Sequence, residues 1–136
     1  MLAKDLMERD VMSVRDTDRV EDLLEALIGE HIHGAPVLDQ EGGLVGVVTQ
    51  QDLFFAPATQ STGSDAATAE RPQPLLVREI MTAPAVSAEE DVDVRQLCRT
   101  MFELRIHRVP ITRQGRLAGI VSSLDICAAV SNGVNL

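Results

Sequence analysis

The stretch that decides the fold is LVGVVTQQDL at residues 44–53, because it recurs as LAGIVSSLDI at residues 117–126. Leu, Gly, Val and Asp are identical in register between the two copies. In each copy the branched apolar residues predict a buried strand, and the polar residues that follow predict the start of a helix. The chain is therefore predicted to be a tandem repeat.

The residues before each copy repeat as well. An amphipathic helix is predicted from apolar residues at i, i+3, i+4, i+7 and i+8 in both copies: Val20, Leu23, Leu24, Leu27 and Ile28, then Val94, Leu97, Cys98, Met101 and Phe102. Asp18 and Asp91 are the predicted N-caps of these helices. A proline-containing strand follows, at 33–38 and at 107–112. Each repeat is thus expected to run strand, helix, strand, strand, helix, after a leading helical turn.

These patterns divide the chain into a first repeat at 1–56, a linker at 57–76 and a second repeat at 77–136. The linker is rich in Ala, Thr, Ser and Pro and has no apolar period. It is predicted to be flexible.

Composition excludes some classes of partner. The net charge at pH 7 is −9, only one of the twelve basic residues is Lys, and three Phe are the only aromatic residues. Binding to nucleic acid needs a basic stripe or stacking aromatic residues, so no nucleic-acid partner is predicted. No signal peptide or membrane span is predicted either, and we expect a cytoplasmic protein that does not bind membranes.

The charge is unevenly placed along the chain. Residues 1–56 carry twelve acidic and four basic residues, whereas residues 78–136 carry seven of each. An anionic ligand would therefore favour a pocket bordered by arginines of the second repeat. The candidates are Arg95, Arg105, Arg108, Arg113 and Arg116, and a solvated surface is the alternative for each.

A hydroxyl and an acid stand three residues apart where each closing helix is expected to begin. The pairs are Thr49 with Asp52 and Ser122 with Asp125. They fit a capping box, in which side chains satisfy the first N–H groups of a helix. They equally fit an anion site at a helix N-terminus. The residues alone leave both interpretations open.

The chain resembles a tandem CBS-domain protein, a pair of the modules named after cystathionine β-synthase. The matching run in the second repeat is REIMTAPAVSAEEDVDVRQLCRTMFELRIHRVPITRQGRLAGIVSSLDIC at 78–127. It contains a Met-Thr start, an apolar helix, a proline-led strand and a closing Gly-Ile-Val-Ser-x-x-Asp-Ile. The first repeat matches from Lys4 to Phe54, with Glu8 in place of the Thr after Met7. The resemblance implies an α/β (α+β) fold of two βαββα repeats packed as a pseudo-two-fold pair.

In the family, such pairs commonly bind adenosine-containing ligands such as AMP, ADP, ATP or S-adenosylmethionine in clefts between the repeats. The resemblance implies that Asp52 and Asp125 bond ribose hydroxyls and that Thr49 and Ser122 lie by the ribose and phosphate. It places backbone of Gly34 and Ala35, or of Arg108 and Val109, at the adenine, with Ser13 and Ser87 nearby. His107 and Arg108 near a phosphate make the second site the better candidate.

The expected function is that of a stand-alone regulatory module that signals through a conformational shift and requires no cofactor. The alternative is a ligand-free structural module that forms a dimer or docks a protein partner. A homodimer is expected by resemblance, through apolar helical residues that could equally belong to the core: Leu53, Phe54, Phe55, Ile126 and Val130.

Other chemistry is not predicted. His31 and His33 lack further ligands at metal spacing, and no serine nucleophile motif is present. Cys98 and Cys127 are predicted to be buried small apolar residues in a reducing compartment. We therefore expect neither a metal site nor an enzyme.

Overall fold

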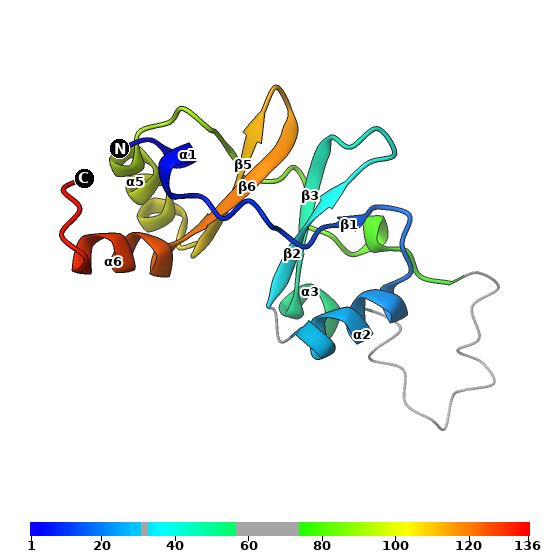
Figure 1. Cartoon of the computed structure of the whole chain (residues 1–136). Coiled ribbons are helices and arrows are strands. Elements are labelled where there is room, and N and C mark those ends of the chain that lie inside the picture. Colours follow the sequence, from blue (N-terminus) through cyan, green and yellow to red (C-terminus); the bar gives the residue numbers. More distant parts are fainter. Residues whose placement is uncertain (31–32, 57–73) are drawn as a thin grey trace. The chain divides into compact units, whose positions relative to one another are not determined.

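The computed structural model describes residues 1–30, 33–56 and 74–136, which form two compact units (Figure 1). The first-repeat unit is Met12–Ala85, and the second-repeat unit joins Met1–Val11 to Val86–Leu136. Each unit contains one three-stranded sheet.

The sheet of the first-repeat unit has the strand order β1-β2-β3. β1 runs parallel to β2, and β2 runs antiparallel to β3. The elements are β1 (Val14–Arg15), α2 (Val20–Glu30), β2 (Gly34–Leu38), β3 (Leu44–Thr49), α3 (Gln50–Phe54) and a 3₁₀ helix at Val77–Glu79.

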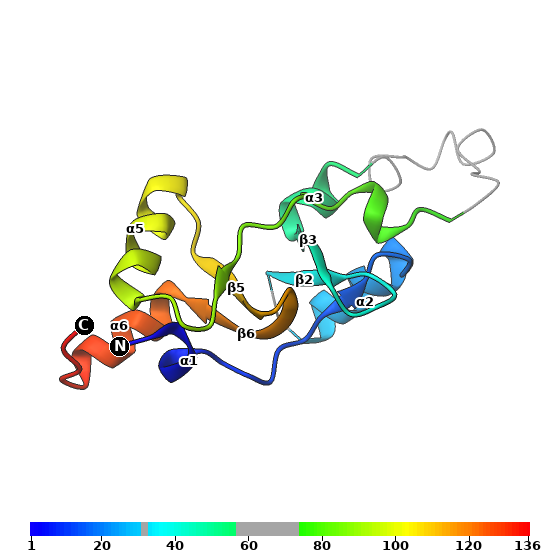
Figure 2. The same cartoon turned by 90° about the horizontal axis from the view of Figure 1, so that it is seen from above.

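The second-repeat unit has the same topology, with the strand order β4-β5-β6. Figures 1 and 2 show α5 and α6 on the same side of this sheet. The elements are α1 (Ala3–Leu6), β4 (Ala88–Glu89), α5 (Val94–Leu104), β5 (Arg108–Arg113), β6 (Arg116–Ser122) and α6 (Ser123–Ser131). The predicted α/β fold and the order strand, helix, strand, strand, helix are confirmed in both units.

The units differ from the sequence repeats in their leading segments. The amide of Glu8 donates to the carbonyl of Ile120 at 2.9 Å, so the start of the chain packs on the second repeat. The amide of Thr82 donates to the carbonyl of Val47 at 2.8 Å, so the segment after the linker packs on the first. The boundaries expected at 1–56 and 77–136 come from the repeat in the sequence. Because the two copies are similar, the repeat does not show on which of them a leading segment packs.

The linker boundary also differs from the expectation. Residues 57–73 lie outside the described part of the chain, so the predicted flexibility concerns residues of which the structure says nothing. Leu75, assigned to the linker, is buried in the core of the first-repeat unit, and its carbonyl accepts from the amide of Val20 at 2.9 Å. Leu75 and Leu76 are only two apolar residues at the end of the predicted linker, which is too few to show the period of a helix or a strand. The sequence pattern therefore could not assign Leu75 to the core.

The leading segments pass closely over one glycine in each sheet. A Cβ at Gly46 would lie 2.8 Å from the carbonyl oxygen of Thr82, and a Cβ at Gly119 would lie 2.7 Å from that of Glu8. Met81 and Met7 cover the same two glycines with their side chains. The Gly shared by the two copies therefore permits a close backbone approach.

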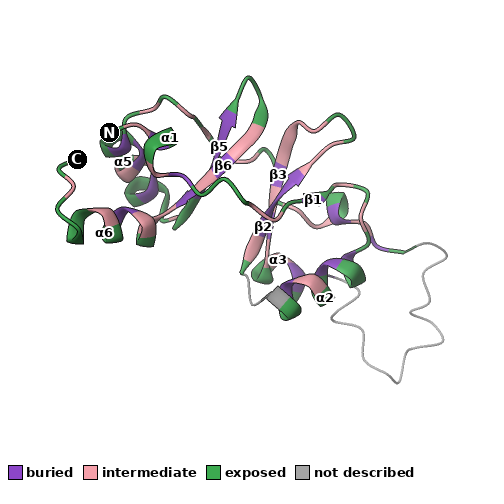
Figure 3. Ribbon diagram, viewed as in Figure 1, coloured by how far each residue is buried: buried purple, intermediate pink, exposed green. Residues whose placement is uncertain are grey.

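The cores follow the predicted periodicity, as the buried strand residues in Figure 3 show. Val37, Val48, Val109 and Val121 are fully buried in their sheets. The predicted helix stripes are wider than the core, because Ile28 is 66% exposed and Phe102 is 77% exposed. These two apolar side chains therefore belong to the surface.

Neither predicted N-cap is observed as the cap of its helix. Asp93, and not Asp91, caps α5, since its side chain accepts from the amide of Arg95 at 2.7 Å. α5 begins at Val94, two residues later than a cap at Asp91 would place its start. Asp18 lies two residues before α2 and accepts from the amide of Arg15 at 2.9 Å.

Candidate functional site

The hydroxyl and acid pairs form capping boxes in the structure. The amide of Asp52 donates to Oγ1 of Thr49 at 3.2 Å, and the amide of Thr49 donates to Oδ2 of Asp52 at 2.9 Å. At α6 the corresponding distances for Ser122 and Asp125 are 3.1 Å and 2.9 Å. The capping interpretation is therefore correct, and it uses only one oxygen of each carboxylate in this exchange.

The strand register brings most of the second-repeat candidates together. Arg108 pairs with Ser122 across β5 and β6, and Val109 pairs with Val121. The carbonyl of His107 accepts from the amide of Ser123 at 2.8 Å, which ties this residue to the start of α6. His107, Arg108, Ser122 and Asp125 thus lie around one helix N-terminus, with His107 and Arg108 exposed.

The first-repeat candidates lie in the same arrangement around α3. Gly34 pairs with Thr49, and Ala35 pairs with Val48. The carbonyl of His33 accepts from the amide of Gln50 at 3.0 Å. The two sets are therefore matched position by position, within separate units.

Ala35 is 5% exposed and Val109 is 0% exposed over the whole residue, so Val109 presents neither its side chain nor its backbone at the surface. β4 pairs with β5 at Ala88–Ile111 and Glu89–Thr112, beyond Arg108 and Val109. Within the described part of the second-repeat unit, no strand pairs with Arg108 and Val109 on the side of β5 away from β6. At this edge Arg108 is exposed, whereas Val109 is fully buried.

Ser13 and Ser87 are exposed and stand directly before β1 and β4. Each lies in the same unit as the candidates of its own repeat. The described contacts include no hydrogen bond from either serine to another candidate residue. Their role as site residues stays a prediction.

The second carboxylate oxygen distinguishes the two sites. Oδ1 of Asp52 accepts from Oγ1 of Thr82 at 3.2 Å. Oδ1 of Asp125 has no hydrogen-bond partner among the residues that the structure describes, and Asp125 is half-buried. Asp125 therefore keeps an acceptor for another molecule, whereas Asp52 uses both oxygens within the chain.

This difference follows from one residue in each leading segment. Thr82 pairs with Val47, and Glu8 occupies the same place opposite Ile120. Glu8 brings a carboxylate instead of a hydroxyl, and its Oε1 accepts from the amide of Asp10 at 3.2 Å. In the sequence this difference is visible as Met81-Thr82 in one leading segment and Met7-Glu8 in the other. The contact between Thr82 and Asp52 could not be predicted from it.

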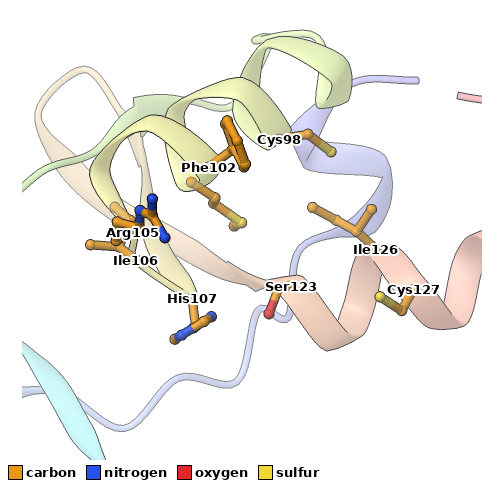
Figure 4. Close-up of a pocket in the computed structure, with 9 residues that line it drawn as sticks. Cys98, Phe102, Arg105, Ile106, His107, Ser123, Ile126 and Cys127 are labelled. Carbon is orange, nitrogen blue, oxygen red and sulfur yellow. The ribbon is translucent and has the colours of Figure 1, made fainter.

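A groove of about 360 Å³ lies between α5 and α6 of the second-repeat unit (Figure 4). Its lining is mainly apolar and comprises Cys98, Met101, Phe102, Arg105, Ile106, His107, Ser123, Ile126 and Cys127. Of the predicted site residues it contains His107 and, from the candidate arginines, Arg105. The cysteine prediction is wrong for Cys127, which is exposed on α6 next to the buried Ile126, and Cys98 is only partly buried.

The arginines expected around an anion site are spread over the unit. Nε of Arg95 donates to the carbonyl of Leu136 at 2.6 Å, and Nε of Arg113 lies 3.2 Å from a carboxylate oxygen of Glu90. Arg105 lines the groove. Arg108 is the arginine that the strand register brings beside Ser122.

Within the described ranges no group of three metal-ligating side chains occurs, and His31 lies outside those ranges. No described helix combines the length and the apolar character needed to cross a membrane.

A model of the CBS domain matches residues 3–59 and 77–132. The chain belongs to the CBS domain family. Its two matches contain both hydroxyl and acid pairs and both glycines that the leading segments cover.

Solved CBS domain pairs share the fold. The pair of protein MJ0100, in complex with 5′-methylthioadenosine and S-adenosyl-L-methionine, is 25% identical with a TM-score of 0.77, and the match covers 98% of each chain. CBSX2 in complex with AMP is 23% identical with a TM-score of 0.81, and 96% of each chain is covered.

Two of the curated relatives are much longer proteins. Inosine-5′-monophosphate dehydrogenase of Methanocaldococcus jannaschii is 30% identical over 125 residues, which are 91% of this chain and 22% of the enzyme. Protein MJ1225 of the same organism is 21% identical over 122 residues, which are 90% of this chain and 40% of that protein. The chain thus spans less than half the length of these two relatives.

Proposed function

We propose that the protein is a regulatory module that binds an adenosine-containing ligand, with the ribose held by Asp125. The candidates are AMP, ADP, ATP and S-adenosylmethionine. The observation that carries the proposal is Oδ1 of Asp125, an acceptor without a described partner on a half-buried side chain whose other oxygen is fixed by the amide of Ser122. A carboxylate held in this way can accept a ribose hydroxyl without reorganisation.

The surroundings of Asp125 suit the rest of such a ligand. α6 begins at Ser123 and is nine residues long, so its N-terminal end carries partial positive charge. Arg108 and His107 are exposed beside it and can approach a phosphate or a carboxylate. The edge of β5 at the exposed Arg108, which β4 does not pair, is the place proposed for the adenine.

The ligands of a relative support the same class of molecule. The CBS domain pair of MJ0100 binds 5′-methylthioadenosine and S-adenosyl-L-methionine, and both contain an adenosine moiety. We carry over the adenosine part only. Titration with the four candidate compounds identifies the group attached to the ribose.

The Asp52 site is the weaker one in this proposal. A ribose hydroxyl at Oδ1 of Asp52 must displace the hydroxyl of Thr82 or share the oxygen with it. α3 has only five residues, so its dipole is smaller than that of α6. The expected stoichiometry is therefore one tight site per chain, followed by a weaker second site.

Regulation requires that the ligand bind one conformation better than another. We propose that ligand binding shifts the equilibrium between arrangements of the two repeats and that a protein partner or attached domain responds. The assembly proposed for the module is a homodimer. The proposed location is the cytoplasm.

A second candidate function is a ligand-free module for dimerisation or docking. The exposed apolar side chains favour it, since Phe54 is 74% exposed and Phe55, on which its ring packs, is 60% exposed. Exposed apolar side chains that lie together are typical of interaction surfaces. In this function the capping boxes serve folding alone.

Isothermal titration with AMP, ADP, ATP, S-adenosylmethionine and NAD at fixed salt tests the proposal. We expect one of them to bind, and Asp125→Ala to weaken binding by about 1 to 3 kcal/mol because the hydroxyl acceptor is lost. Asp52→Ala is the matched control at the weaker site. Thr82→Val should strengthen the second binding event, because it removes the hydroxyl that occupies Asp52.

The outcomes separate the two candidate functions. A ligand at 100 times its dissociation constant should stabilise the protein by about 2.7 kcal/mol, which a thermal shift detects. No heat and no thermal shift with any of the five compounds would favour the ligand-free module. Unchanged affinity in a folded Asp125→Ala protein would reject the assignment of the ribose.

A further inference from the structure

Glu8 stands in the second-repeat unit where Thr82 stands in the first-repeat unit. The backbone groups of Glu8 and Ile120 exchange two hydrogen bonds, each of 2.9 Å. Thr82 and Val47 exchange the same two bonds, at 2.8 and 3.0 Å. Ile120 and Val47 are equivalent positions of the two sequence copies. The side chains of Glu8 and Thr82 therefore start from equivalent backbone positions.

The same equivalence relates the two acids of the capping boxes. Asp125 and Asp52 each stand five residues after the paired strand residue, at the third position of their helices. From its position Thr82 reaches Oδ1 of Asp52 at 3.2 Å. Glu8 belongs to the same compact unit as Asp125. Its side chain thus starts from the place from which a threonine reaches the equivalent acid.

The side chain of Glu8 ends in a carboxylate instead of a hydroxyl. It is exposed, and its Oε1 accepts from the amide of Asp10 at 3.2 Å. Oε2 has no hydrogen-bond partner among the residues that the structure describes. Glu8 therefore resembles Asp125, since each carboxylate has one oxygen bonded to a backbone amide and one oxygen available to another molecule.

Two carboxylates of this kind suit a ligand that brings two donors. An ionised carboxylate only accepts hydrogen bonds, so Glu8 and Asp125 cannot satisfy each other. The 2′ and 3′ hydroxyls of a ribose are donors on neighbouring carbon atoms. One can donate to Oδ1 of Asp125 and the other to Oε2 of Glu8. At the first-repeat site Thr82 is itself the donor, so this pair of acceptors exists only in the second-repeat unit, within the described residues.

We infer that Glu8 determines the specificity of the ligand site by accepting the second ribose hydroxyl, so that the site takes adenosine compounds with both hydroxyls free. The inference rests on the proposed function, in which Asp125 accepts the first hydroxyl. A phosphate on either hydroxyl would meet two carboxylates, and such a like-charge contact is costly. Adenosine 2′- and 3′-phosphates are therefore excluded, whereas the group at the 5′ position does not enter this selection.

The test uses three nucleosides that share the adenosine moiety and lack the variable 5′ group: adenosine, 2′-deoxyadenosine and 3′-deoxyadenosine. NMR titration of the full chain follows the two sites separately, through the amide signals of residues 122–125 and of residues 49–52. At the Asp125 site, each deoxynucleoside should bind the wild type at least about tenfold more weakly than adenosine does. The reason is that each lacks one hydrogen bond to a charged acceptor.

Two variants of Glu8 separate its possible effects. Glu8→Thr introduces the residue of the first-repeat site, whose hydroxyl should occupy Oδ1 of Asp125, so adenosine should bind at least about tenfold more weakly. Glu8→Ala removes an acceptor without supplying a donor. In this variant the loss of one ribose hydroxyl should no longer change the affinity. Loss of the other hydroxyl, which Asp125 accepts, should still weaken binding about tenfold.

Glu103→Gln is the matched control. Glu103 is exposed on α5 of the same unit and has no hydrogen bond or ion pair with Glu8 or Asp125 among the described contacts. Its substitution should leave the affinities for all three nucleosides unchanged. Thermal unfolding followed by circular dichroism verifies that each variant is folded.

The outcomes distinguish the role of Glu8 from the proposed function. A Glu8→Ala protein that still loses affinity with both deoxynucleosides would overturn the inference, because Glu8 would then accept neither hydroxyl. If Asp125→Ala weakens adenosine binding in the same titrations, the proposed function stands without Glu8. If adenosine shifts no signal of residues 122–125 in the wild type, the assignment of the ribose and the role of Glu8 are both rejected.

Discussion

At the scale of single residues, Gly46 and Gly119 are the positions over which the leading segments cross the sheets. A Cβ at Gly119 would stand 2.7 Å from the carbonyl oxygen of Glu8 and 2.8 Å from the sulfur of Met7. The methionine side chain could move, but the backbone oxygen is held by the hydrogen bond from the amide of Ile120 at 2.9 Å. The leading segment therefore has to shift if this residue gains a side chain.

Gly119→Ala is expected to destabilise the protein by about 1 to 3 kcal/mol, the usual cost of overpacking a well-packed site. Chemical denaturation measures the change in the free energy of unfolding. Gly29→Ala is the control, because a Cβ at this helical residue meets nothing within 4 Å. It should instead stabilise α2 by about 0.5 to 1 kcal/mol. Equal effects of the two substitutions would mean that the close approach is not constraining.

Thr82 and Glu8 show how one side chain separates two otherwise matched sites. Both residues follow a methionine and pair with the same strand position of their units. The hydroxyl of Thr82 reaches Asp52, whereas the carboxylate of Glu8 accepts from the amide of Asp10. Thr82 thus supplies a donor to Asp52, whereas Glu8 is an acceptor and supplies none to Asp125. Of the two carboxylates, only Asp125 keeps an oxygen for another molecule.

At the scale of the elements, the capping boxes define where α3 and α6 begin. Both helices follow the last strand of their sheet without an intervening loop, so the N-cap residue is also the end of the strand. The same carboxylate that would meet a ribose thus also fixes the start of a helix. A substitution of this carboxylate would change both helix stability and ligand binding. A substitution of the N-cap hydroxyl removes part of the cap and keeps the carboxylate for binding.

Ser122→Ala removes the hydroxyl that accepts from the amide of Asp125 and keeps the carboxylate. It should destabilise the protein by about 0.5 to 2 kcal/mol, the range measured for lost N-caps. Thermal unfolding followed by circular dichroism measures the change.

The control for this prediction is Ser131→Ala at the other end of α6. Its hydroxyl donates to the carbonyl of Ala128 at 2.9 Å on an exposed surface, so a change within about 0.5 kcal/mol is expected. If Ser122→Ala were as mild as Ser131→Ala, the cap would add little to the stability of α6.

At the scale of the whole molecule, the leading segments tie distant parts of the sequence into one unit. Ala3 and Met7 are buried in the core of the second-repeat unit with residues more than eighty positions later in the chain, such as Leu97 and Ile126. The amide of Ala3 also donates to the carbonyl of Val92 at 2.9 Å. The second sequence repeat is thus incomplete without the first residues of the chain.

Removal of residues 1–9 should therefore destabilise the second-repeat unit more than the first. The loss of buried Met7 alone corresponds to about 1.5 to 3 kcal/mol of transfer free energy. Amide hydrogen exchange should show lower protection in β5 and β6 than in the intact chain, with smaller changes in β2 and β3. Loss of protection confined to the first-repeat unit would contradict the observed packing.

The sequence by itself determined the repeat, the order of the elements and the start of each closing helix. These features depend on periodicity and caps, which involve residues close together in the chain, such as Ser122 and Asp125. It also determined which residues fill the sheets, because Val48 and Val121 stand at matching positions of strongly apolar strands.

Only the tertiary structure decided which repeat each leading segment covers, because two copies with nearly the same pattern offer it equivalent surfaces. It also decided that Asp52 uses both carboxylate oxygens and Asp125 one, since that contact joins residues thirty positions apart. The exposure of Ile28, Phe102 and Cys127 depends on how far each helix is rotated on its sheet. A helical period gives the width of an apolar stripe but not the part of it that the sheet covers.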